Sequence, residues 1–448
     1  MIRLSDRNVG DGVMELTQEQ MQNYTTILHE ELIPAMGCTE PIAIAYAAAK
    51  AKSLLPEAVE AVQIRCSGNI IKNVKGVTVP QSGGLKGIPA AAVLGICGGD
   101  ADKVLEVIAT VTDADRVAAR ELLERNICTV DLAEGVPGLY IDVTVKGKQH
   151  SAQVILSQTH THIAKMVQDG KILVEQKASS GSAEQKGNRD AMNLAGILGY
   201  AKQVELDTVR DVLEQQWQYN SAISTEGLEH SWGAQVGRTI QETGAGSVME
   251  RAEAAAAAGS DARMSGCPKP VVINSGSGNQ GITVTMPVLV YAKAWKKTKE
   301  ETLRALLVSN LISIYIKHYI GPLSAFCGAV SAACGAGAAV TWMASDGDYQ
   351  RVAMTITNTL CNVGGIVCDG AKPSCAAKIA ASVHAALMAH AMSMRMQVFK
   401  PGEGLVGDDI ETTIKNIGYL GKEGMKQTDI DILKVMIGQV NVDKAITQ

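Results

Sequence analysis

Three cysteines late in the chain have the residue type and spacing that best suit metal chemistry. Cys327 lies in AFCGAV, and Cys368 and Cys375 lie in CDGAKPSC, all in apolar, glycine-rich surroundings. The spacing does not match a zinc knuckle, whose paired ligands have about two to four residues between them. Three thiolates also leave one position unfilled in a tetrahedral site or in a four-iron cluster. A metal centre with a free position can bind a substrate, so this pattern indicates a reactive centre.

Helix geometry bears on whether the last two cysteines can act together. Residues seven apart on one continuous helix are separated by roughly 10 Å along its axis, which is too far to grip one small cluster. Gly370 and Pro373 interrupt any helix between Cys368 and Cys375. A loop can therefore bring both sulfur atoms to one side.

Cys327 completes the set because it follows the helix break at Gly321-Pro322, whereas no break separates it from Cys334. We interpret Cys334 as a core residue and leave the role of Cys361 open. Structural roles are expected for four other cysteines: Cys66, Cys97, Cys128 and Cys267.

The motif GCTEP at 37–41 places a further cysteine before a predicted helix. Pro41 suits the first turn of a helix, and Thr39 or Glu40 can cap it. Cys38 then precedes the helix N-terminus, where the dipole favours an anion and lowers the pKa of a thiol. A thiolate at this position could act as a base. The alternative is an ordinary buried cysteine in a turn.

Two glycine-rich stretches, SGGLKG at 82–87 and NSGSGNQG at 274–281, each precede an apolar run. Backbone N–H groups in such loops can hold a carboxylate or a phosphate. Neither stretch is a P-loop, because GK[ST] is missing, and neither fits GxGxxG. Each alone is equally consistent with a simple turn. The residues that we expect to contact a ligand are Ser82, Gly83, Gly84, Ser277, Gly278, Asn279 and Gln280.

The N-terminal part of the chain mixes helical and strand-like patterns. Helices are predicted at 17–33 and 42–55, and the stretches 100–126 and 157–168 look helical or irregular. Alternating or β-branched runs predict strands at 58–70, 76–80, 138–147, 150–158 and 172–178.

A polar stretch, KASSGSAEQKGNRD, ends this segment near residue 190, and most of the later sequence has helical periodicity. Cys38 and the late cysteines must meet for joint chemistry, although the strand-rich segment separates them. We therefore predict an α+β protein with a mainly helical catalytic domain (1–55 and 186–448) and an inserted α+β domain (56–185). The later helices are expected at 204–218, 231–258, 300–319, 324–343, 348–360, 375–397 and 426–440.

Composition limits the partners and the compartment. The 448 residues carry a net charge of −5 that is spread along the sequence, which argues against nucleic acid as a partner. The ten cysteines are dispersed and the N-terminus shows no apolar signal segment, so we expect a reducing cytoplasm. The uncharged run from Tyr319 to Ser345 is long enough to span a bilayer. Gly321-Pro322 interrupts it, so we expect a buried core helix and no membrane partner.

In combination and in this order, GCTEP, SGG, SGSGNQG and the late C…CDGAKPSC resemble the L-cysteine desulfidase family, over nearly the whole chain. That family is related to the catalytic α part of iron–sulfur L-serine dehydratases. The resemblance implies an oxygen-sensitive [4Fe–4S] cluster with one iron free of cysteine. Carried onto this sequence, its ligands are Cys327, Cys368 and Cys375, the base is Cys38, and SGSGNQG is a substrate-binding loop. A small amino acid is the implied substrate, and a homodimer stays open.

Two departures favour the desulfidase branch over the dehydratase branch. Serine dehydratases have a wider gap between their last two cluster cysteines than CDGAKPSC has. They also carry a cysteine near the C-terminus, whereas this sequence has none after Cys375.

Other functions remain open on the sequence alone. A serine dehydratase or a lyase for another β-substituted amino acid would need the same chemistry. A pyridoxal-phosphate enzyme could also perform the elimination through a lysine, although no lysine stands out. A redox or iron sensor with a labile cluster is the non-catalytic alternative.

Overall fold

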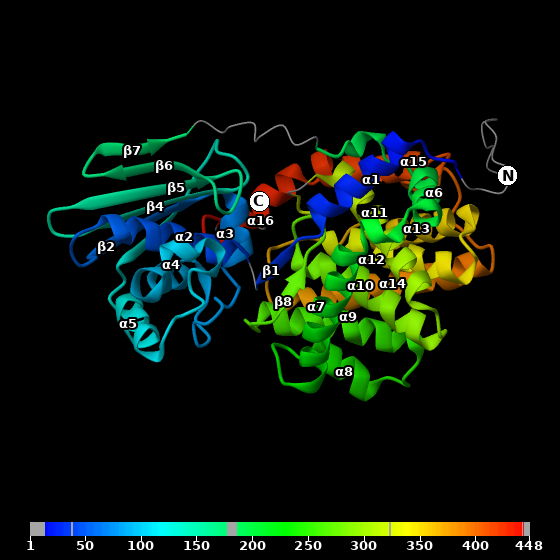
Figure 1. Cartoon of the computed structure of the whole chain (residues 1–448), viewed down its shortest axis with the longest axis horizontal. Helices are drawn as coiled ribbons and strands as arrows, with labels where there is room; N and C mark the ends of the chain where they lie inside the picture. The colour runs from blue at the N-terminus through cyan, green and yellow to red at the C-terminus, as the bar shows by residue number, and fades with distance from the viewer. Residues whose placement is uncertain (1–13, 37–38, 177–185, 322–323, 441, 443–448) are drawn as a thin grey trace.

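The computed structural model describes residues 14–36, 39–176, 186–321, 324–440 and 442. Figure 1 shows two lobes side by side, one built around a β-sheet and one almost wholly helical. We call residues 39–176 the sheet lobe and residues 14–36 and 186–425 the helical lobe. The protein is therefore of the mixed α+β class, as the sequence predicts.

The sheet lobe contains a six-stranded sheet of order β3-β2-β4-β5-β6-β7. The β2–β3 pair is parallel and the other neighbouring pairs are antiparallel. Alternate residues of β2 and of β5 are buried, because one face of the sheet packs on helices α2 and α4. The elements of this lobe are α2 (Thr39–Leu54), β2 (Ala61–Cys66), α3 (Gly68–Val74), α4 (Gly87–Gly98), α5 (Asp113–Glu124), β3 (Cys128–Leu132), β4 (Tyr140–Lys146), β5 (Ser151–Ser157), β6 (Ile163–Gln168) and β7 (Lys171–Glu175).

The helical lobe packs long helices closely over small residues. A Cβ atom added at Gly335 would overlap the backbone oxygen of Ser309 on the neighbouring helix, so α11 and α12 approach at backbone distance. The helices and short strands are α1 (Gln18–Glu31), β1 (Pro34–Met36), α6 (Leu194–Gln203), α7 (Arg210–Glu229), α8 (Val236–Thr243), α9 (Val248–Met264), β8 (Pro270–Val272), α10 (Gly278–Ala294), α11 (Lys299–Ile320), α12 (Gly328–Ala344), α13 (Tyr349–Val363), α14 (Cys375–Met394) and α15 (Ile410–Tyr419). A last helix, α16 (Lys426–Met436), lies between the lobes and contacts α3.

Each lobe has its own hydrophobic core. Residues of α1, α6, α7 and α9 to α15 form one core, and residues 42–156 form the other, against which Leu433 and Ile437 also pack. Helix α2, assigned from sequence to the helical domain, thus packs in the core of the sheet lobe. The division into domains 1–55 plus 186–448 and 56–185 stays a prediction.

Several predicted elements differ from the structure. The stretch 157–168 contains strand β6 and not a helix, and 76–80 is no strand but holds one isolated bridge, Thr78 to Lys86. The single helix expected at 231–258 is the pair α8 and α9, because Gly244 and Gly246 separate them and Ser247 caps the second. Strand β3 and helices α6, α10 and α15 were not predicted.

Among the described residues, one helix is long and apolar enough to cross a membrane. It is α14 and not the run after Tyr319, and just over half of its most apolar window is buried in the protein. A core helix of a helical domain has the same properties.

Candidate active site

A short antiparallel contact brings two of the three predicted ligands together. Phe326 pairs with Val367, and on either side of this pair the Cys327 N–H donates to the Ile366 oxygen (3.0 Å) and the Cys368 N–H to the Ala325 oxygen (2.6 Å). In such a pairing the neighbours of Phe326 and Val367 point to one common face. Cys327 and Cys368 are therefore diagonal neighbours on the same side, a relation that separates the two residues by about 7–8 Å and their Cβ atoms by somewhat less.

The third cysteine joins them through a tight loop. Gly370 has φ of 91°, a conformation that suits glycine, and the chain then turns into α14, whose first residue is Cys375. The Cys375 sulfur lies 3.5 Å from the Gly370 oxygen. The three thiols are close enough that Cys368 and Cys375 both act electrostatically on Cys327.

The chemistry of the donor set suits an iron–sulfur cluster, which cysteine thiolates hold. Cys327 and Cys368 lie on one face of the short pairing, and Cys375 begins the helix that follows the same loop. Among the described residues, no group of three His, Cys, Asp or Glu side chains is close enough to hold a single metal ion.

Burial keeps the Cys327 and Cys375 thiols protonated until metal binds. It is the main reason that the pKa of Cys327 is raised to about 12, and the neighbouring Cys368 thiol contributes to that rise. The pKa of Cys375 is also raised, again chiefly by burial. Metal binding must therefore release protons here, so it is favoured at higher pH.

Cys334 and Cys361 lie apart from the three predicted ligands and close to each other. Cys334 is fully buried in α12, and its sulfur lies 3.9 Å from the Ile356 oxygen. Cys361, whose role the sequence leaves open, acts electrostatically on Cys334.

The loop 274–281 reaches the cysteines through one side chain. Ser277 caps α10, which begins at Gly278, and the Gln280 side chain packs against Gly328, the residue after Cys327. The Gln280 Oε1 atom is buried and has no hydrogen-bond partner among the described residues. An unpaired buried amide oxygen is costly, so this atom is available to a ligand at the cysteines. Asn279 points elsewhere, because its Oδ1 accepts a hydrogen bond from Arg263 (3.3 Å).

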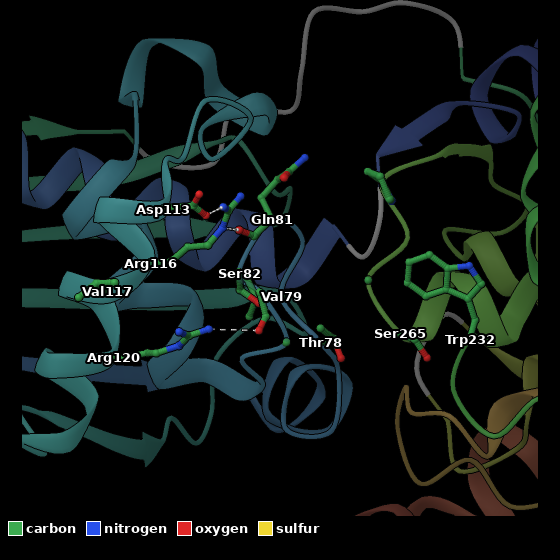
Figure 2. A pocket seen from close by; sticks show the side chains of 14 residues that line it. Thr78, Val79, Gln81, Ser82, Asp113, Arg116, Val117, Arg120, Trp232 and Ser265 are labelled. Atoms are coloured by element: carbon green, nitrogen blue, oxygen red, sulfur yellow. Dashed lines mark hydrogen bonds and ion pairs between the residues drawn. The ribbon is translucent and has the colours of Figure 1, made fainter. Parts of the chain in front are cut away.

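The SGG loop lines a cavity of about 460 Å³ between the lobes. Gly83 and Gly84 have φ of 68° and 95°, and a Cβ added at Gly84 would meet no atom within 4 Å. Ser82, in contrast, is buried and donates to the Leu85 oxygen (3.1 Å), so its hydroxyl holds the loop together. Figure 2 shows this loop and Arg120 on one side of the cavity and Trp232 on the other.

A single segment, residues 76–84, links this cavity to the cysteine loop. At Gly76 an added Cβ would lie 3.3 Å from the Lys372 side chain in the cysteine loop, and at Gly266 it would lie 3.0 Å from Thr78 at the cavity. The segment 76–84 therefore runs from the cysteine loop to the SGG glycines.

Cys38 lies outside the described residues. The elements on either side of it are placed: β1 pairs with β8, which leads into the 274–281 loop, and α2 begins at Thr39. Next along α2, Glu40 accepts a hydrogen bond from Asn73 of α3 (3.2 Å).

Lysines beside the cysteines were missed by sequence reasoning. Lys317, in the last turn of α11, is 8% exposed, and Lys72 of α3 is 4% exposed. Burial lowers the pKa of Lys317 to about 8, while the thiol groups of Cys368 and Cys327 act in the opposite direction. The available signal was a single charge inside the apolar run LLVSNLISIYIK.

Comparison with known proteins identifies the family. Residues 102–434 match the model of the serine dehydratase alpha chain. The chain is 47% identical over 418 residues to a UPF0597 protein of Finegoldia magna, which covers 93% of this chain and 100% of that protein. It is 48% identical over 411 residues to a UPF0597 protein of Lachnoclostridium phytofermentans, covering 92% and 98%. This similarity indicates a lyase that uses an iron–sulfur cluster. The chain belongs to the serine dehydratase alpha chain family.

Proposed function

We propose that this protein is an L-cysteine desulfidase, which converts L-cysteine to pyruvate, ammonia and hydrogen sulfide. The observation that carries the proposal is the meeting of Cys327, Cys368 and Cys375 with the unpaired Gln280 oxygen at Gly328. The proposed metal ligands and an unpaired polar group that could bind a ligand would then lie in one site, in which Cys327 and Gln280 are buried.

The cofactor proposed is a [4Fe–4S] cluster held by Cys327, Cys368 and Cys375. When bound, it would supply a Lewis acid whose iron favours the soft sulfur of a thiol. The short spacing between Cys368 and Cys375 supports the desulfidase branch over serine dehydration.

The reaction itself is an α,β-elimination. A base takes the Cα proton, the electron pair of that C–H bond forms the Cα=Cβ double bond, and the Cβ–S bond breaks with its electrons on sulfur. The resulting aminoacrylate hydrolyses to pyruvate and ammonia. We assign the base to Cys38.

Binding of the amino acid is assigned to the two glycine-rich loops. The Gln280 oxygen can accept from the substrate ammonium group, and the N–H groups of Gly83 and Gly84 and of Gly278 and Asn279 can hold its carboxylate. The N–H groups of Ser82 and Ser277 are occupied, since they donate to the backbone oxygens of Val79 (3.3 Å) and Asn274 (3.0 Å). The low exposure of Gln280 and Cys327 keeps water away from the reacting atoms.

Substrate competition tests the proposal. Protein reconstituted with iron and sulfide without oxygen is expected to have a higher kcat/KM for L-cysteine than for L-serine, measured as pyruvate and hydrogen sulfide release. Preference for serine would make it a dehydratase. An intact cluster without turnover of either would favour the sensor. Activity without iron that is lost on borohydride treatment with substrate would indicate pyridoxal phosphate.

Gly328 offers a way to test Gln280 without changing it. An added Cβ at this glycine would lie 2.6–2.9 Å from the Gln280 amide atoms, so Gly328→Ala must displace that amide. We expect KM for cysteine to rise about three- to tenfold with kcat nearly unchanged, because one hydrogen bond to bound substrate is lost.

The matched control is Gly365→Ala, where an added Cβ meets nothing within 4 Å. It should leave KM unchanged. Equal KM values for the two variants would remove Gln280 from the substrate site.

A further inference from the structure

Lys317 is a buried cation that no carboxylate neutralises. Its residue is 8% exposed, and no Asp or Glu lies within ion-pair distance of it in the part of the chain that the structure describes. Burying an ammonium group without a counter-charge costs several kcal/mol. A protein retains such a group where an anion compensates it.

The other lysines nearby already have partners. Lys72 pairs with Asp429, and Lys372 and Lys378 share Asp369. Among the described residues, ion pairs to Asp429 and Asp369 thus account for three of the four lysines, and Lys317 has no such pair. Lys317 is also more deeply buried than Lys372 and Lys378, which are partly exposed.

The end of α11 that carries Lys317 lies beside the cysteine loop. An added Cβ at Gly421 would lie 3.0 Å from Ile320 of α11 and 3.3 Å from Phe326, the residue before Cys327. The charges of Cys368 and Cys327 favour the Lys317 ammonium, whereas that of Lys72 opposes it. Lys317 also occupies the last turn of α11, where the helix dipole favours a cation. Its position therefore suits a counter-ion for thiolates and not a surface ion pair.

We propose that Lys317 is a positioning residue of the cysteine centre, whose ammonium is the buried counter-charge of the Cys327 and Cys368 thiolates when they hold an iron–sulfur group. The proposal rests on the proposed cluster and does not depend on which substrate is used. Three thiolates make the cluster a net anion, and Lys317 compensates that charge inside the protein.

Lys317→Met distinguishes this role from ordinary packing, because it should stabilise the cluster-free protein but weaken the hold on the cluster in the reconstituted protein. Without a cluster, the variant should melt at a higher temperature than the unmodified apoprotein, since a buried unpaired charge is replaced by an apolar chain of similar length. With the cluster reconstituted, a chelator should bleach its visible absorbance at least about tenfold faster, since the charge-assisted contact is lost. The cluster should also be harder to reduce, which lowers its midpoint potential.

Lys317→Arg keeps the charge and should restore chelator resistance. Lys52→Met is the control for a lysine-to-methionine change, because the Lys52 ammonium bonds the oxygens of Leu55 and Glu57 in the sheet lobe (3.2 and 2.9 Å). It should leave the midpoint potential and the bleaching rate unchanged.

Lys317→Met with normal bleaching and an unchanged potential would overturn the proposal, whatever its melting temperature. Failure of the unmodified protein to take up iron would instead refute the proposed cofactor. Iron uptake by the unmodified protein therefore shows whether the cofactor proposal or the Lys317 proposal has failed.

Discussion

Cys368→Ala is expected to leave a folded protein that holds no complete cluster and has no lyase activity. The same holds for Cys327→Ala and Cys375→Ala, because each removes one of only three proposed protein ligands. The Cys327 and Cys375 thiols are neutral in the apoprotein because burial raises their pKa values, so their loss removes packing but leaves no unpaired charge. The measurements are iron and sulfide per chain after reconstitution, thermal unfolding of the apoprotein, and pyruvate release.

Cys334→Ala is the matched control, since it removes a buried cysteine from α12, the helix that begins directly after Cys327. Only packing and the weak contact to the Ile356 oxygen are lost, so a cost of about 1–2 kcal/mol in unfolding free energy is expected, with the cluster retained. A reconstituted Cys368→Ala protein with four irons and full activity would disprove the ligand assignment.

Cys38→Ala is expected to keep the cluster and substrate binding but to lower kcat at least about 10²-fold, the low end for a positioned base. The start of α2 at Thr39 agrees with the predicted helix N-terminus that would stabilise a thiolate. Cys38→Ser should restore little, because a hydroxyl group does not ionise near neutral pH. The measurement is exchange of the substrate Cα hydrogen with solvent deuterium.

The exchange rate separates the base from other roles. Loss of exchange in Cys38→Ala, with the iron spectrum intact, is the expected result. Exchange at the rate of the unmodified protein would show that another residue removes the proton. Cys38 would then be left with a structural role or a role in capping the free iron.

Local sequence patterns predicted the elements whose periodicity is strong. Helix α1 and strands β4 and β5 lie within one or two residues of their predicted ranges, since one face of each is buried and the other is not. Strand β6 was missed because the polar SQTHTH stretch before it hides the alternation. Helix α10 was missed because it is buried on nearly all sides and contains Pro287, so it shows no amphipathic period.

Residue chemistry alone pointed to the three cysteines, and their role as ligands stays a prediction. The site was not predictable where a role depends on contact between distant segments. Lys317 becomes notable only when α11 ends beside Cys327 and Cys368, and Gln280 only when its amide meets Gly328. The lone charge in its apolar run marks Lys317 as unusual, but nothing in the local sequence shows which residues either side chain contacts.

The glycine in the cysteine loop determines how closely the two lobes approach each other there. At Gly370 an added Cβ would overlap the backbone oxygen of Lys72, so the loop and α3 touch backbone to backbone. Any side chain at this position would have to push α3 away from the cysteine loop, and the φ of 91° would add backbone strain. The glycine therefore ties the proposed metal ligands, all of which belong to the helical lobe, directly to the sheet lobe.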